Sequence, residues 1–279
     1  MDRTPDVLEL VPALKAKGEA FALATVVRTV AATAAKAGAK AIVRCDGTIS
    51  EGWIGGGCAR GAVVAAAREA IADGKARLVS VQPPDVLQSH GVSAGEEREG
   101  VRFAKNTCPS QGTMDIFIEP VLPRPQVVIC GSSPVAVAIG DLARRVGFWV
   151  TICSPTAEKG AFADADRWID GYTPPPSDEG ERFIVVSTQS RGDEKALHGA
   201  LATDASYVAF VGSRRKVKAL KAVLAARGVD ERRLAALRCP AGLDLGAIGP
   251  DEIAFSILAE IIAFRRGRDR KSQVEQTDT

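Results

Sequence analysis

The chain has little of several features that mark large classes of protein. Aromatic residues are only 5% of its 279 residues, and its formal net charge is +2. We therefore expect neither a stacking platform for bases nor a strongly basic surface, which argues against nucleic acid as a partner. Histidine is also scarce. The two that occur, His90 and His198, are expected to face solvent and not to act in acid–base catalysis.

Long hydrophobic runs are missing as well. No stretch reaches the roughly 18 apolar residues that a membrane helix needs, and the polar, acidic start at residues 1–6 is unlike a signal peptide. The six cysteines are widely spread and form no Cys-x-x-Cys pair, which argues against a zinc site or a disulfide framework. We therefore expect a cytoplasmic protein with reduced thiols.

The most informative feature that is present is a run of three glycines, Gly55, Gly56 and Gly57, directly before Cys58. These glycines remove side chains from the approach to the sulfur and free amides for an anionic ligand. Residues 58–71 have the spacing of an amphipathic helix. The thiol is therefore expected near a helix N-terminus, where the dipole favours thiolate. A tight loop with a small buried cysteine is the alternative.

Up to residue 122 the sequence predicts a smaller N-terminal α+β domain. A polar stretch at 82–107 predicts either a mobile loop or one irregular hairpin. The other expected elements are helices at 7–17 and 58–71 and strands at 21–30, 39–44, 48–52, 77–81 and 114–119, with Asp46-Gly47 as a hairpin turn.

Prolines at 120, 123 and 125 indicate a linker, after which strands and helices alternate. This rhythm implies a parallel sheet. Residues 123–266 are therefore expected to form a Rossmann-like, doubly wound α/β domain, followed by a flexible tail at 267–279. The expected strands are 127–130, 147–153, 183–187 and 207–211, and the expected helices are 134–146, 193–202, 215–227 and 251–264.

The turn Gly131-Ser132-Ser133-Pro134 stands where a dinucleotide fold carries Gly-x-Gly-x-x-Gly. Only the first glycine is present, and Ser133 replaces the second. In dinucleotide-binding folds, an acidic residue at the end of the second strand usually hydrogen-bonds a ribose hydroxyl. Here Ser154 occupies that position. The periodicity predicts the fold, while these replacements weaken the case for ordinary NAD. A dinucleotide fold that serves only as a scaffold is the alternative.

A second candidate anion site is Ser213-Arg214-Arg215-Lys216, which places three cations at a helix start. Cations there oppose the helix dipole at a cost of about 0.3–1 kcal/mol each, so we expect an anion nearby. A solvated basic turn is the alternative. The glycine-rich segment 240–246, which contains Gly242, is expected either to face the same crevice or to be an ordinary connector.

Together these motifs resemble the XdhC/CoxF family of molybdoenzyme maturation proteins, over about residues 21–266. The resemblance rests on an Asp-Gly hairpin followed by Gly-Gly-Cys, on a second cysteine with glycine before a strand ending in Glu-Pro, and on three later segments. These are Asp46-Gly47, Gly56-Gly57-Cys58, Cys108-Pro109-Ser110-Gln111-Gly112, Glu119-Pro120, 212–216, 240–246 and 251–261. The loop 28–36 lacks the family's Ser-Ser-Pro-Arg signature, and 188–193 lacks its histidine. These departures look more like the carbon monoxide dehydrogenase accessory branch.

The resemblance implies a chaperone that needs no substrate turnover of its own. It would bind the molybdenum cofactor, in its molybdopterin cytosine dinucleotide form, support its sulfuration, and deliver it to an apo molybdenum hydroxylase such as xanthine or carbon monoxide dehydrogenase. Cofactor biosynthesis or sulfuration proteins are the other expected partners, and a homodimer is a further expectation.

Within this reading, Cys58 and Cys108 contact molybdenum or a sulfur transferred to it, because molybdenum is thiophilic and thiolate is the competent form. The amides of Gly55–Gly57 and the cations of Arg214–Lys216 hold the anionic cofactor. One alternative is an oxidoreductase or flavin carrier that binds FAD, or less favourably NAD(P), in the Rossmann-like domain. Another is an adaptor with no ligand.

Overall fold

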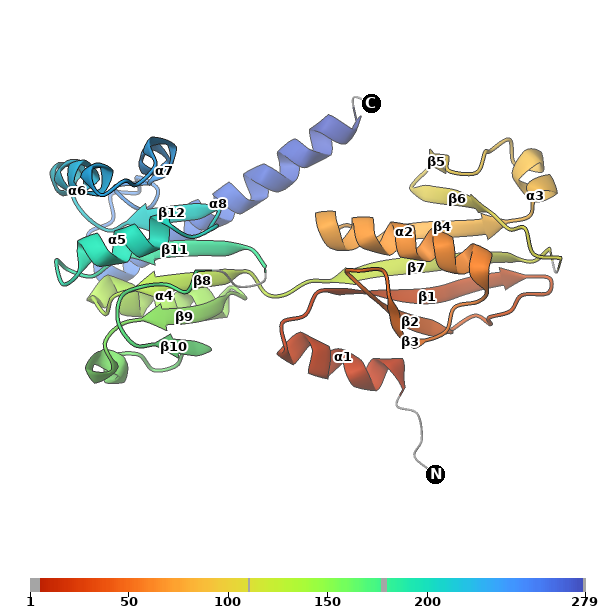
Figure 1. Cartoon of the computed structure of the whole chain (residues 1–279), viewed down its shortest axis with the longest axis horizontal. Helices are drawn as coiled ribbons and strands as arrows, with labels where there is room; N and C mark the ends of the chain where they lie inside the picture. Colours follow the sequence, from red (N-terminus) through yellow and green to blue (C-terminus); the bar gives the residue numbers. More distant parts are fainter. Residues whose placement is uncertain (1–5, 110, 177–179, 278–279) are drawn as a thin grey trace. The chain divides into compact units, whose positions relative to one another are not determined.

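The computed structural model of the chain describes residues 6–109, 111–176 and 180–277, with side chains up to residue 267 (Figure 1). It divides into two compact units, Met1–Pro123 and Arg124–Thr279. Along the described chain, no helix is long and apolar enough to cross a membrane.

The first unit is a seven-stranded sheet with the order β3-β2-β1-β7-β4-β6-β5. Neighbouring strands are antiparallel except β4 and β6, which run parallel. Its elements are α1 (Val7–Ala16), β1 (Phe21–Val30), β2 (Lys40–Arg44), β3 (Ile49–Gly52), α2 (Gly57–Asp73), β4 (Arg77–Gln82), α3 (Pro84–Ser89), β5 (Glu97–Arg98), β6 (Val101–Lys105) and β7 (Thr113–Val121).

Helix α2 lies along this sheet (Figure 1) and buries a face made mostly of alanine. The buried positions recur at the helical period, as the sequence predicts, and are Ala59, Val63, Ala66, Ala67 and Ala70. Small side chains let the helix approach the strands closely. Val79, Ile116 and Ile118 from β4 and β7 are buried in the same cluster. This packing fixes the N-terminal end of α2 relative to the strands beside it.

The segment 82–107 contains more than the expected loop or irregular hairpin. A hairpin is present, since β5 pairs antiparallel with β6, but α3 precedes it and β6 also pairs parallel with β4. The side chains of β6 are half-buried or exposed throughout. Because neither face is fully buried, the strand shows no clear alternation of apolar and polar residues.

The second unit confirms the expected Rossmann-like, doubly wound α/β fold. Its five strands are all parallel, in the order β10-β9-β8-β11-β12. The elements are β8 (Gln126–Cys130), α4 (Pro134–Arg145), β9 (Trp149–Cys153), the 3₁₀ helix η1 (Thr156–Ala161), β10 (Arg167–Ile169), β11 (Arg182–Val186), α5 (Asp193–Leu201), β12 (Tyr207–Phe210), α6 (Arg214–Ala226), α7 (Glu231–Ala236) and α8 (Pro250–Thr277).

The strands of this unit are buried because helices cover both faces of the sheet. Every residue of β8, β11 and β12 is buried. One face packs in a cluster with residues of α4 and α8, and the other packs with residues of α5, α6 and α7. The sheet therefore presents its functional groups at the carboxyl ends of its strands, where the loops begin.

Helix α8 differs from expectation because it continues from Pro250 to Thr277, past the predicted end at Phe264 and through most of the predicted tail. The residues after Phe264 are mainly arginine, lysine, glutamine and glutamate, which have good helix propensity. Their polarity removed the apolar periodicity on which the prediction depended. The short elements η1, β10 and α7 were also not predicted.

Candidate functional site

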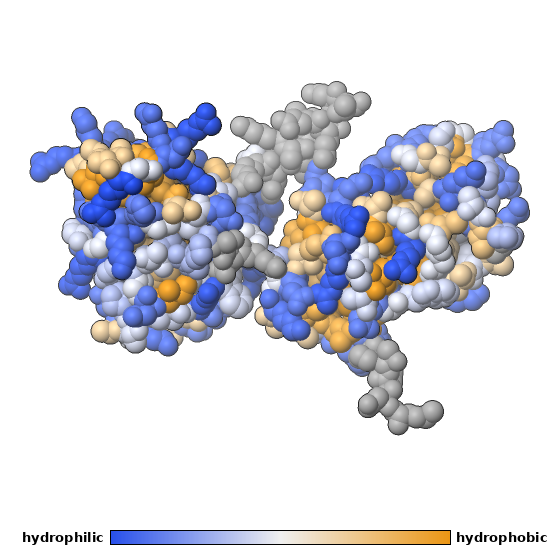
Figure 2. All heavy atoms as spheres, in the orientation of Figure 1, coloured by the Kyte–Doolittle hydropathy of each residue, from blue (hydrophilic) through white to orange (hydrophobic). Residues whose placement is uncertain are grey.

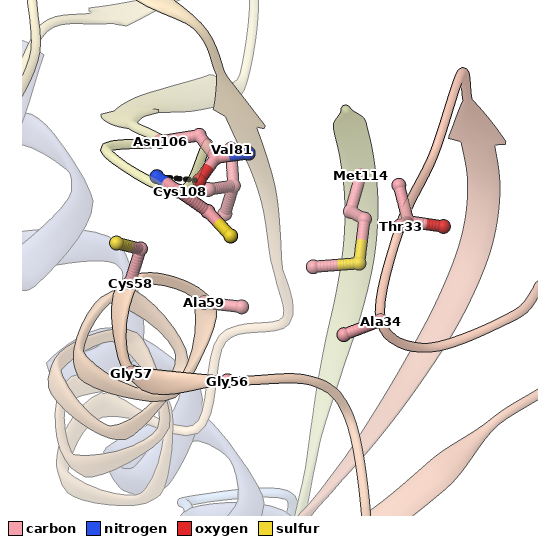
Figure 3. Close-up of a pocket in the computed structure, with 10 residues that line it drawn as sticks. All are labelled: Thr33, Ala34, Gly56, Gly57, Cys58, Ala59, Val81, Asn106, Cys108 and Met114. Atoms are coloured by element: carbon pink, nitrogen blue, oxygen red, sulfur yellow. Dashed lines mark hydrogen bonds between the residues drawn. The ribbon is translucent and has the colours of Figure 1, made fainter. Parts of the chain in front are cut away.

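The two cysteines predicted as site residues line one pocket in the first unit (Figure 3). It is a cavity of about 250 Å³. In Figure 3, Cys108 and Met114 point toward one another across the pocket, and the first turn of α2 closes one side. The lining residues are Thr33, Ala34, Gly56, Gly57, Cys58, Ala59, Val81, Asn106, Cys108 and Met114.

The Cys108 loop is held by Asn106, a buried residue that sequence reasoning missed. Asn106 Oδ1 accepts a hydrogen bond from the Cys108 amide at 2.9 Å, and Asn106 Nδ2 donates to the Gly112 carbonyl oxygen at 2.7 Å. Gly112 is required here, since a Cβ at this position would overlap the Ala32 carbonyl oxygen. Asn106 could have been found from the sequence, because it is a polar residue between a strand and the Cys108 motif.

The three glycines before Cys58 have different reasons to be glycine. Gly55 is buried with φ +117°, and a Cβ there would lie 3.1 Å from Met114 Cε. Gly56 and Gly57 are exposed, have ordinary φ, and a Cβ on either would meet nothing within 4 Å. The fold therefore requires Gly55, while Gly56 and Gly57 leave open space beside the pocket.

Helix α2 begins with Gly56 as its N-cap, and glycine has no side-chain oxygen to satisfy the first amides. Helix N-termini leave up to four N–H groups without a partner inside the helix. The first turn also contains no acidic residue. The start of α2 therefore offers amides and a positive dipole end to an anion at the pocket.

The Cys58 thiol is half-exposed and close to Thr107, which the sequence analysis did not single out. Cys58 Sγ lies 2.9 Å from Thr107 Oγ1. Hydrogen bonds from the Thr107 hydroxyl and amide hold the pKa of Cys58 below its ordinary value, against smaller opposing effects of desolvation and of Cys108. Thiolate is the form that binds soft metals and attacks sulfur, so this contact prepares Cys58 for either task.

Replacing Thr107 by valine is expected to raise the pKa of Cys58, because the hydroxyl that stabilises the thiolate is lost. Alkylation by iodoacetamide needs thiolate, so its rate rises as the pH passes through the thiol pKa. The midpoint for the native chain should lie below that of an ordinary cysteine thiol, and should move upward in Thr107→Val.

Thr107→Ser is the control, since it keeps the hydroxyl and should keep the low midpoint. Trypsin leaves Cys45 and Cys58 in one peptide, bounded by Arg44 and Arg60. The rates are therefore best measured by mass spectrometry in a Cys45→Ser background. Identical midpoints for Thr107→Val and the native chain would contradict the role of Thr107.

In the second unit, the predicted nucleotide turn is explained largely by local geometry. Gly131 has φ +115°, and a Cβ there would overlap the Ser187 carbonyl oxygen. Ser133 is the N-cap of α4 and accepts from the Ala136 amide at 3.0 Å, while Pro134 occupies the first helical position. Ser133 Oγ also lies 2.6 Å from Ser187 Oγ. These residues therefore join β8 to β11 at the point where the strand order reverses.

An acidic residue does lie at the end of the second strand of this unit, although the sequence analysis missed it. Ser132 and Ser154 both donate hydrogen bonds to Glu158 Oε2, and Tyr172 donates to Oε1 at 3.3 Å. The hydrogen bonds from Ser132 and Ser154 lower the pKa of Glu158. Glu158 belongs to η1, four residues after Ser154, and only the turn of η1 brings it back to the strand end.

The basic start of α6 is partly satisfied within the unit. Lys216 Nζ lies 2.5 Å from Asp193 Oδ2 and donates to Ser190 Oγ at 2.9 Å. Ser213 is the N-cap and accepts from the Lys216 amide. The predicted excess of cations is therefore reduced, because Lys216 is paired with a buried carboxylate.

Arg214 and Arg215 are exposed, and Figure 2 shows hydrophilic side chains projecting from the region of α6 and α7. Gly242 has a structural role: its amide donates to Glu260 Oε2 at 2.8 Å, and a Cβ would overlap Ser256 Oγ. The prediction that Gly242 faces a ligand therefore gains no support from these contacts.

Within the described residues, no group of three or more histidine, cysteine, aspartate or glutamate side chains could hold a metal ion. Cys58 and Cys108 provide two thiols, which suits a metal that arrives with ligands of its own.

Both units match models of known protein families. Residues 127–261 match the model of the XdhC Rossmann domain, and residues 14–82 match that of the XdhC and CoxI family. The chain is 29% identical over 265 residues to the protein YqeB of Escherichia coli (strain K12), covering 88% of this chain and 43% of YqeB.

A second relative, a probable xanthine dehydrogenase subunit from Bacillus subtilis (strain 168), is 26% identical over 162 residues, covering 55% of this chain and 47% of the relative. The chain thus spans less than half the length of these curated relatives. A crystal structure described as a xanthine dehydrogenase from Bacillus halodurans shares 20% identity, covering 94% of this chain and 96% of that one, with a TM-score of 0.44. With both family models matched in order along it, this chain belongs to the XdhC family.

Proposed function

We propose that this chain is a maturation protein for a molybdenum hydroxylase of the xanthine or carbon monoxide dehydrogenase type. It binds the molybdenum cofactor as cargo, supports its sulfuration and delivers it to the apo-enzyme, working with cofactor biosynthesis or sulfuration proteins. Family membership and the name of the Bacillus subtilis relative support the client class. The pocket that brings Cys58 and Cys108 together carries the proposal.

The pocket offers the ligand chemistry that a thiophilic metal needs. Two thiols and the Met114 thioether line it, and soft sulfur ligands suit soft metal–sulfur centres. Thr107 keeps the Cys58 thiolate accessible at lower pH. Cys58 therefore binds the metal or its sulfur, and Cys108 assists from the neighbouring loop.

The size of the pocket limits which part of the cargo it receives. A cavity of about 250 Å³ lies below the roughly 300–1,000 Å³ of pockets that enclose a drug-sized ligand. It receives the metal–sulfur end, and the remainder of the molybdopterin cytosine dinucleotide lies outside. The open space at Gly56 and Gly57, together with the amides at the start of α2, suits an anionic group next to that end.

Two features bear on the branch of the family and on the second unit. The loop that lacks the Ser-Ser-Pro-Arg signature contributes Thr33 and Ala34 to the pocket, so the departure lies at the site itself and favours a client of the carbon monoxide dehydrogenase type.

Exposed Arg214 and Arg215 offer cations to an anionic ligand of the second unit.

Nucleotide binding by the second unit is the second candidate function. Glu158 at the end of β9, bonded to Ser132 of the first turn, stands where this fold grips a ribose hydroxyl. In the sequence, the lack of an acidic residue directly after β9 weakened the case for a dinucleotide. The position of Glu158 strengthens the case for FAD, or for NAD(P), as a ligand.

The test is to produce the full chain in cells that make the molybdenum cofactor, purify it gently under reducing conditions, and identify what it carries. Elemental analysis should find molybdenum, and mass spectrometry should find molybdopterin with a cytidine nucleotide in comparable amount. A flavin or nicotinamide without molybdenum would support the second candidate and reject the first. Protein that carries neither would reject both and favour an adaptor.

A further inference from the structure

The second unit exposes a cluster of large apolar side chains that the proposed function does not use. Among the described large apolar residues exposed in this unit, all but Val223 belong to the end of α4, the loop before α8, or α8 itself. We name this cluster the α8 patch; it consists of Val146, Leu243, Leu245, Ile248, Phe255 and Ile262. Monomeric soluble proteins rarely expose a large contiguous apolar patch without a partner.

The loop and the helix form one continuous surface. The Leu243 amide donates to the Ser256 carbonyl oxygen at 3.2 Å, which fixes the loop against α8. A cavity of about 490 Å³ lies between Leu142 of α4, the loop at 245–247 and Phe255 of α8. Phe255 is 62% exposed at the edge of this hollow. The patch therefore carries both a hollow and projecting side chains.

On α8 the outward residues follow a narrow seam. Phe255, Ala259 and Ile262 are separated by four and three residues, the spacing of a helix–helix seam. The opposite face of α8 is buried in the core of the unit through Ala254, Ile257, Leu258 and Ile261. The seam therefore faces away from that core, and the small Ala259 at its centre lets another helix approach closely.

Charges at the two ends of the seam are opposite in sign. Glu252 lies seven residues before Ala259 and Arg266 lies seven residues after it, and both are exposed. Glu252 Oε2 accepts from the Ile248 and Gly249 amides at 2.8 and 3.1 Å, which holds this carboxylate at the start of the helix. Residues 265–271 contain five basic residues and one acidic residue.

An antiparallel copy of α8 crossing at Ala259 matches both the charges and the shape. Each Glu252 then lies beside Arg266 of the second copy, whereas a parallel copy places like charges together. Each Ile262 lies beside Phe255 and the hollow of the other copy. The same surface thus supplies the projection and the recess, as a two-fold symmetric contact requires.

We propose that a second copy of this chain covers the α8 patch, through antiparallel α8 helices related by a two-fold axis at Ala259. All the residues involved belong to the second unit, and the inference is independent of the cofactor. Sedimentation of the full chain over a range of concentrations should give a particle of twice 29.2 kDa. A single-chain mass at every concentration, or a larger assembly, would overturn the proposal.

Phe255→Glu should raise the dissociation constant of this dimer by at least about 30-fold, since it places a charge from each copy within the apolar contact, beside Ile262 of the other copy. Val223→Glu is the matched control, because Val223 is an exposed apolar residue of α6 in the same unit. It should leave the mass unchanged. Circular dichroism should show that both variants are folded. A dimer as tight in Phe255→Glu as in Val223→Glu would contradict the assigned surface.

Ala259→Cys tests the position of the axis without disturbing the contact. Residues on a two-fold axis meet their own copies, so mild oxidation should convert most of this variant to a covalent dimer on a non-reducing gel. Ala219→Cys, at an exposed position of α6, carries the same native cysteines and should remain largely a single chain. Equal cross-linking of the two variants would reject α8 as the interface.

Discussion

Cys58→Ala protein is expected to retain at least about tenfold less molybdenum than the native chain, the equivalent of losing one moderately strong ligand. Cys58 is the thiol that combines a lowered pKa, a place in the pocket and the first turn of a helix. Alanine removes the sulfur while filling the same helical position with a good helix former, so the fold should be unaffected.

The matched control is Cys45→Ala. Cys45 is also an exposed thiol of the first unit, but it lies at the β2–β3 turn, where its Sγ donates to the Ala20 carbonyl oxygen. Molybdenum per chain should be measured for both variants after identical purification. Activation of an apo-hydroxylase should follow the same order. Equal molybdenum in Cys58→Ala and the native chain would remove Cys58 from the site.

Gly131→Ala should destabilise the second unit by about 3 kcal/mol, combining a left-handed backbone with a backbone overlap. Gly131 has φ +115°, and its missing Cβ would overlap the Ser187 carbonyl oxygen. That oxygen belongs to the chain just after β11, so it has little freedom to move. For a unit of this size the loss corresponds to a fall in Tm of about 6–12 °C.

Gly160→Ala is the comparison for this prediction. Gly160 lies in η1 of the same unit, and a Cβ there meets nothing within 4 Å. Its substitution should change stability by no more than about 0.5 kcal/mol. Differential scanning calorimetry of both variants measures the difference. A Gly131→Ala protein as stable as Gly160→Ala would show that the turn tolerates a side chain and that the glycine serves another purpose.

The sequence predicted the elements whose pattern is local. Helix α2 has an apolar period along its whole length, and β8 and β11 are short apolar runs next to helices, so their type followed from periodicity. The doubly wound fold followed from the order of those elements. Strand β6 could not be predicted in this way, because its place beside β4 is a long-range pairing and its side chains are never fully buried.

The same distinction between local patterns and long-range contacts applies to the candidate site. The glycines and cysteines of the pocket stand out in the sequence. Thr107 does not, and Asn106 gives only a weak signal, because the roles of both depend on a loop that turns back to Cys58 and Gly112. Lys216 shows the reverse case. Its charge suggested an external anion, whereas Asp193 from the start of another helix provides a partner within the unit.

Strand β1 pairs with β7 in the middle of the first sheet, and this pairing joins Phe21 to Val121. These two residues lie near opposite ends of the first unit in the sequence. The pairing of β1 with β7 can therefore form only after residue 121 has left the ribosome. Non-local pairings of this kind fold slowly, because the long loop must be closed before the contacts form. The pocket needs Thr33 from one side of that loop and Met114 from the other. During synthesis, therefore, the pocket around Cys58 forms only when the first unit is complete, and under the proposed function the cofactor would bind only after that point.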